Sequence, residues 1–124
     1  MKTFLFGIIF AAFFSLNACK TISVQQNVPK TDIIELVKNS ETVLVDVRIP
    51  EQYAEGTAKD AINIPLAEIQ NKAESLKGKK VVVFCNKGIQ ADDAVEILEK
   101  NGIEVYDGKT LDNIKAIQNL QVKD

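Results

Sequence analysis

The sequence of 124 residues contains no histidine and no tryptophan, and it has only two cysteines. The absence of histidine excludes catalytic triads with an imidazole base and removes the commonest metal ligand. Lysine and arginine are scattered and the formal net charge is −2, so no basic surface for nucleic acid is indicated. We therefore expect no metal, no other cofactor and no nucleic-acid partner.

A hydrophobic run long enough to cross a bilayer is missing as well. Phe4 to Leu16 is apolar and uncharged but has 13 residues, whereas a spanning helix needs about 20. A short apolar run that follows a basic residue, here Lys2, is typical of a cleaved export signal. The tetrapeptide Leu16-Asn17-Ala18-Cys19 resembles a bacterial lipobox, in which the cysteine is lipidated and becomes the first mature residue.

We therefore expect residues 1–18 to be a signal peptide of the lipoprotein type and Cys19 to carry the lipid. The protein would then be exported to the periplasm or the outer face of a bacterial membrane, with the membrane as its partner through the anchor. Ordinary signal cleavage near Ala18 and an uncleaved anchor are the alternatives. With Cys19 lipidated, Cys85 is the one free thiol of the mature chain. Because cysteines of exported proteins normally pair, Cys85 is either buried and inert or kept for its reactivity.

Strand and helix patterns alternate after a polar tether at residues 19–30, within which Ile22 to Val24 has the composition of a short edge strand. Apolar, β-branched runs predict strands that are covered on both faces. We expect strands at 42–47, 61–65, 81–84 and 103–106, a turn at 107–108, and helices at 51–55, 66–76, 91–101 and 111–120, preceded by a helix that Thr31 or Asp32 caps. Residues 31–124 are therefore predicted to form one α/β domain with a largely parallel sheet.

Cys85 ends one of these apolar strands, and a short loop leads from it to the helix expected near Ala91. Gly88 in this loop permits a positive φ, so successive main-chain N–H groups can curve around one point. The helix start adds unsatisfied donors and partial positive charge. A sulfur at that point would be stabilised as the thiolate, the reactive form of cysteine. Lys87 would add a cation if it turned inward, and Asp92 with Asp93 is expected to point outward.

Several motifs follow one another in chain order. They are Val43-Leu44-Val45-Asp46-Val47-Arg48, followed by Glu51-Gln52-Tyr53 and Gly56, then Ala61-Ile62-Asn63-Ile64-Pro65-Leu66, and last the loop Cys85-Asn86-Lys87-Gly88-Ile89-Gln90-Ala91. Together they resemble a rhodanese domain, and the last of them resembles its active-site loop. The resemblance runs from about Thr31, with Ile22 as the alternative start, to the C-terminus. It implies a three-layer α/β/α fold with a mainly parallel sheet of about five strands.

The resemblance also implies sulfur transfer. Cys85 would attack a sulfane-sulfur donor such as thiosulfate, hold the sulfur as a persulfide and pass it to a thiol or cyanide-like acceptor, or to a protein acceptor. The main-chain amides that would cradle the persulfide belong to Asn86, Lys87, Gly88, Ile89, Gln90 and Ala91. The Lys87-Gly88 pair is similar to that of members that use thiosulfate. Asp46 and Arg48 are implied to be a structural ion pair rather than catalysts.

The chain departs from the family pattern at several positions. Gln90 and Ala91 stand where many single-domain members have arginine and then serine or threonine, so a bidentate anion clamp is missing. Thr57 follows Gly56 at a position where the family usually has histidine. Nearer the C-terminus, the family usually has two glycines and a tryptophan, and here only Asp107-Gly108-Lys109 corresponds to them.

Two functions stay open on this basis. The missing arginine argues against a phosphatase of the related loop type, and the lone loop cysteine argues against a disulfide oxidoreductase. The first open function is an enzyme, a rhodanese-type sulfurtransferase. The second is a non-catalytic rhodanese-like module that carries persulfide or binds a partner protein.

Overall fold

Four parallel strands in the order β2-β1-β3-β4 form the centre of the computed structural model, which describes residues 30–121. The strands are β1 (Val43–Asp46), β2 (Ile62–Asn63), β3 (Lys80–Cys85) and β4 (Glu104–Thr110). The helices are α1 (Lys30–Lys38), α2 (Pro50–Glu55), α3 (Leu66–Lys72), the 3₁₀ turn η1 (Ala73–Leu76), α4 (Ile89–Lys100) and α5 (Leu111–Asn119). The edge strand considered at residues 22–24 lies outside the described residues.

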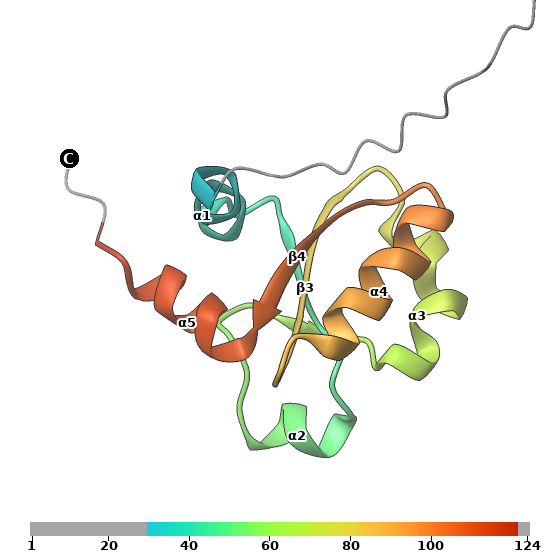
Figure 1. Cartoon of the computed structure of the whole chain (residues 1–124), viewed down its shortest axis with the longest axis horizontal. Coiled ribbons are helices and arrows are strands. Elements are labelled where there is room, and N and C mark those ends of the chain that lie inside the picture. Colours follow the sequence, from blue (N-terminus) through green and yellow to red (C-terminus); the bar gives the residue numbers. More distant parts are fainter. Residues whose placement is uncertain (1–29, 122–124) are drawn as a thin grey trace, which may run out of the picture.

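The helices cover both faces of the sheet, as Figure 1 shows, with α1 and α5 on one side and α3 and α4 on the other. Successive residues of a strand point to opposite faces. In β3, Val81, Val83 and Cys85 therefore join the core under α3 and α4, whereas Val82 and Phe84 join the core under α1 and α5. This arrangement confirms the predicted three-layer α/β/α fold with a parallel sheet. No helix among residues 30–121 combines the length and the apolar character that a membrane crossing needs.

The prediction of a turn at Asp107-Gly108 was wrong, because these two residues lie inside β4. A bulge interrupts the pairing there: Val83 pairs with Asp107, but Cys85 pairs with Thr110, so β4 carries one extra residue. Gly108 lets α5 pack closely, since a Cβ at this position would come within 2.7 Å of the Ile114 side chain and 2.9 Å of the Val83 carbonyl oxygen. The strand therefore continues through a sequence that is typical of a turn.

Two helix starts also differ from the expectation. Helix α4 begins at Ile89 rather than near Ala91, because Gly88 adopts the left-handed conformation with φ +87° and takes the N-cap position. Helix α1 begins at Lys30, before the two residues that were expected to cap it. Helix α2 starts at Pro50 and is followed by Gly56 with φ +146°, as the sequence pattern indicates.

Candidate functional site

Cys85 lies at the carboxyl end of β3, where the chain turns toward α4. Its side chain is almost fully buried, with 2% exposed, and it belongs to the apolar cluster that also contains Ala91. It is a free cysteine. Sites of open parallel sheets form beyond the carboxyl ends of the strands. Cys85 therefore has the position of a site residue together with the burial of a core residue.

One main-chain N–H group of the loop contacts the sulfur. The Gly88 N–H donates a hydrogen bond to Cys85 Sγ at 3.0 Å. The first hydrogen bond of α4 runs from the Asp92 N–H to the Gly88 carbonyl oxygen at 3.0 Å, so the N–H groups of Ile89, Gln90 and Ala91 precede the intrahelical ladder. The sulfur thus has one direct main-chain donor and lies beside a helix start, where negative charge is favourable.

A buried ion pair supports the loop from the neighbouring strand. Asp46 is fully buried and Arg48 is 5% exposed, and their closest approach is 2.7 Å between Nη2 and Oδ2. Hydrogen bonds with Asp46 are the main cause that raises the pKa of Arg48, while burial opposes them. The guanidinium also donates to Asn86 Oδ1 at 3.1 Å and to the Gly56 carbonyl at 2.7 Å. The pair therefore connects β1, the end of α2 and the cysteine loop.

Two further side chains complete this network, and sequence reasoning did not give either of them a role. The Thr57 hydroxyl donates to Asp46 Oδ2 at 2.8 Å. The Asn63 amide donates to the main-chain oxygens of Asp46 and Arg48 at 3.0 and 2.9 Å. The position of Thr57 directly after Gly56 was the available signal, because a hydroxyl there can donate to Asp46 where the family usually has histidine.

A second charged cluster lies on the other side of the loop, where β4 ends. Lys109 Nζ lies 2.6 Å from Asp107 and 3.6 Å from Asp92. Burial, followed by the contact with Asp92, raises the pKa of Asp107. The hydrogen bond with Asp107 is the main cause that lowers the pKa of Asp92, and Lys109 adds to it. The Lys109 carbonyl lies 3.9 Å from Cys85 Sγ, within reach of a weak S–H hydrogen bond.

The structure separates the expected loop residues into two groups. Cys85, Gly88 and Ala91 are buried, whereas Asn86, Lys87, Ile89 and Gln90 are exposed. Lys87 is exposed, and within residues 30–121 its ammonium has no hydrogen bond or ion pair. Asp92 is exposed as expected, although it pairs with Lys109.

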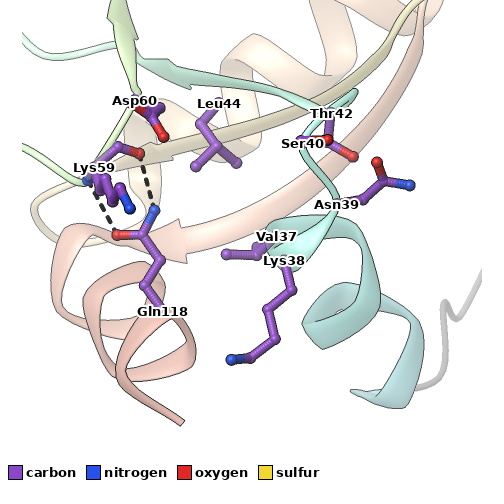
Figure 2. A pocket seen from close by; sticks show the side chains of 9 residues that line it. All are labelled: Val37, Lys38, Asn39, Ser40, Thr42, Leu44, Lys59, Asp60 and Gln118. Atoms are coloured by element: carbon purple, nitrogen blue, oxygen red, sulfur yellow. Dashed lines mark hydrogen bonds between the residues drawn. The ribbon is translucent and has the colours of Figure 1, made fainter. Parts of the chain in front are cut away.

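A cavity of about 410 Å³ lies away from the cysteine (Figure 2). Thr42 and Leu44 line it near the start of β1, whereas Cys85 ends the parallel strand β3, so the two lie toward opposite ends of the strands. The Gln118 side chain closes one side through hydrogen bonds of 3.0 and 2.9 Å with the main chain of Lys59. This cavity is therefore separate from the cysteine loop.

Comparisons with known proteins agree with this geometry. The family model for the rhodanese-like domain matches residues 30–110. The chain is 43% identical over 61 residues to the thiosulfate sulfurtransferase PspE of Escherichia coli, covering 47% of this chain and 59% of that protein. It is 33% identical over 113 residues to the protein YqhL of Bacillus subtilis, covering 88% and 89%.

Solved structures show the same likeness. A rhodanese from E. coli, determined with anions, has a TM-score of 0.55 and 38% identity, covering 58% of this chain and 89% of that one. A rhodanese-related protein from Thermoplasma volcanium has a TM-score of 0.59 and 29% identity, covering 75% and 92%. The match with PspE spans less than two thirds of that relative's length. The chain belongs to the rhodanese-like family, which includes sulfurtransferases.

Proposed function

We propose that this protein is a sulfurtransferase that moves sulfane sulfur from thiosulfate or a similar donor to a thiophilic acceptor through a persulfide on Cys85. The observation that carries the proposal is the 3.0 Å hydrogen bond from the Gly88 N–H to Cys85 Sγ beside the start of α4. Donors at this position favour negative charge on sulfur, and the thiolate is the nucleophile. The relatives named thiosulfate sulfurtransferase support the same reaction class.

The proposed chemistry balances in two steps. The Cys85 thiolate attacks the outer sulfur of thiosulfate, a sulfur–sulfur bond to Cys85 forms, and sulfite leaves with the electron pair of the broken bond. The acceptor, cyanide or a thiolate, then attacks the outer sulfur of the persulfide, and Cys85 leaves as the thiolate. The loop amides from Asn86 to Ala91 would stabilise the charge that the persulfide carries.

Cyanolysis of thiosulfate tests this proposal. Thiocyanate formation by the wild type should be lost in Cys85→Ser, because a hydroxyl cannot carry sulfane sulfur in this cycle. Glu99→Gln, an exposed change on the last turn of α4, should leave turnover unchanged and serves as the control. Equal turnover by wild type and Cys85→Ser would refute the proposal.

A persulfide carrier without turnover is the second candidate. The burial of Cys85 and the exposed position of Lys87 favour it, because both reduce what a small anionic donor can contact. Intact-mass analysis after incubation with thiosulfate or polysulfide separates the candidates. A gain of one sulfur atom at Cys85 without thiocyanate production indicates the carrier.

We further propose that the chain is exported and anchored to a bacterial membrane through a lipid on Cys19, after removal of residues 1–18. These residues lie outside the described part of the structure, and the proposal is supported by the signal-like apolar run after Lys2 and by the lipobox-like tetrapeptide. The wild type should fractionate with membranes, and Cys19→Ala should release or mislocalise it. Wild-type protein found only in the soluble periplasmic fraction would contradict lipidation.

A further inference from the structure

Two exposed isoleucines flank the cysteine loop. Ile49 is 50% exposed and Ile89 is 68% exposed. Ile49 follows β1 and Ile89 follows β3, and these strands are direct neighbours whose register pairs Asp46 with Phe84. The hydrogen bond of 3.1 Å between Arg48 and Asn86 joins the two segments just before the isoleucines. Apolar surface therefore lies on both segments that border Cys85.

The same border carries an excess of negative charge. Segments 49–56, 86–93 and 107–109 hold five acidic residues against two basic residues, whereas the whole chain holds 17 acidic against 15 basic residues. The acidic residues are Glu51, Glu55, Asp92, Asp93 and Asp107, and the lysines are Lys87 and Lys109. Lys109 is already paired with two of these carboxylates. The buried Asp46–Arg48 pair neutralises itself and leaves this balance unchanged.

Hydrogen bonds connect the segments that carry these charges to the cysteine loop, because the Arg48 guanidinium donates to the Gly56 carbonyl at 2.7 Å and to Asn86 Oδ1 at 3.1 Å. Hydrogen bonds with Asp46 are the main cause that raises the pKa of Arg48, and Glu55 and Cys85 add to it. On the other side, the Lys109 carbonyl lies 3.9 Å from Sγ. We define the acidic rim as Ile49, Glu51, Glu55, Ile89, Asp92 and Asp93.

We propose that the acidic rim docks a polypeptide acceptor whose reactive cysteine is flanked by lysine or arginine and by an apolar side chain. This inference rests on the proposed function and names its acceptor. Lysine or arginine complements the carboxylates, while like charges across an interface are unfavourable. The two exposed isoleucines offer apolar surface on which an apolar side chain of a peptide can pack.

The transfer needs no added oxidant. The acceptor thiolate attacks the outer sulfur of the Cys85 persulfide, and a new sulfur–sulfur bond forms on the acceptor. The bond between this sulfur and Sγ breaks, and its electron pair returns to Cys85 as the thiolate. The acceptor leaves as a persulfide, and the protein is ready for another donor.

Two synthetic peptides test the docking. The purified full chain is loaded with polysulfide, and the Cys85 persulfide is verified by intact mass. Its loss is then followed with peptides of equal length in which lysine-isoleucine or glutamate-isoleucine precedes the cysteine. The lysine peptide should react about tenfold faster at low salt, because electrostatic steering acts on the encounter, and added salt should reduce the ratio.

Rim variants separate docking from the intrinsic reactivity of the two peptides. The triple variant Glu51→Gln, Glu55→Gln and Asp93→Asn changes only exposed carboxylates that make no hydrogen bond to the sulfur. In this variant, the ratio of the rate with the lysine peptide to the rate with the glutamate peptide should fall. We expect it to come within about twofold of the ratio that the same two peptides show when they react with a small-molecule persulfide.

A charge-matched variant away from the rim gives the control. Glu35→Gln, Glu41→Gln and Glu99→Gln remove the same number of exposed carboxylates and should leave the ratio at its wild-type value. An equal ratio in the wild type and the rim variant, or faster transfer to the glutamate peptide, would overturn the inference while the proposed function stands. If Cys85 gains no sulfur in the loading step, the proposed function fails and the inference fails with it.

Discussion

Replacing Gly88 by alanine isolates the contribution of one main-chain N–H group to the chemistry of Cys85. Gly88 has φ +87°, and an L-residue in this region costs about 1–2 kcal/mol. Reduced freedom of the unfolded chain returns about 0.4–1 kcal/mol. No clash adds to this, because the nearest atoms to a new Cβ are those of Lys109 at 3.9 and 4.0 Å. The expected loss of unfolding free energy is therefore about 1 kcal/mol.

Gly78→Ala is the matched control, since Gly78 has φ +76° and a Cβ added there would have nothing within 4 Å. Both variants should lose similar stability in urea unfolding. Only Gly88 donates its N–H to the sulfur, at 3.0 Å, and a hydrogen bond to a charged group contributes about 1.5–3 kcal/mol. If the strained alanine rotates this N–H away and half of that energy is lost, persulfide formation should slow about 4- to 13-fold.

Intact-mass kinetics with polysulfide measure this rate for the wild type and both variants. The expected outcome is slow loading in Gly88→Ala and wild-type loading in Gly78→Ala. Equal loading by the two variants, at equal loss of stability, would refute the reasoning. Gly88 would then be a turn residue only, and the N–H group would not contribute to the reactivity of the sulfur.

Three other changes test the scaffold. Asp46→Asn should cost about 3 kcal/mol of unfolding free energy in urea, because it leaves the Arg48 guanidinium buried beside a neutral side chain; a cost below about 1 kcal/mol would show that the pair is not needed for stability. Gly108→Ala should cost about 1–3 kcal/mol, since the new Cβ would meet atoms at 2.7, 2.8 and 2.9 Å, and an unchanged urea midpoint would contradict the close packing of α5. Burial raises the pKa of Asp107, so the stability that its protonated form contributes is present at low pH and is lost as pH rises through the folded-state pKa. Asp107→Asn should therefore gain in melting temperature relative to the wild type as pH rises from about 3 to about 7, and a constant difference would contradict this assignment.

The sheet and its two faces could be predicted from the sequence because the pattern of apolar residues carries that information directly. The runs from Val43 to Val45 and from Val81 to Phe84 are apolar at every position, and in the structure they lie in the two central strands, β1 and β3. The resemblance to a family implied that Asp46 and Arg48 form a structural pair, and in the structure the two side chains approach each other to 2.7 Å.

The parts that could not be predicted depend on contacts between distant residues. Asp107-Gly108 has the composition of a turn, but close packing against α5 keeps both residues in β4. Local pattern could not show that Gly88 would take the N-cap position and move the helix start to Ile89. The role of Thr57 depends on a carboxylate eleven residues earlier. Such contacts follow from the fold, and no periodicity in the chain indicates them.

The extra residue in β4 has a consequence for engineering. Without the bulge between Asp107 and Thr110, β4 would pair with β3 in a regular register. The insertion instead brings the Lys109 carbonyl to 3.9 Å from the sulfur, with Lys109 at φ +65°. Deleting one residue of β4 would thus give a regular strand, but it would also remove the Lys109 carbonyl from its position beside the thiol. A design procedure that rewards ideal geometry would delete this feature first.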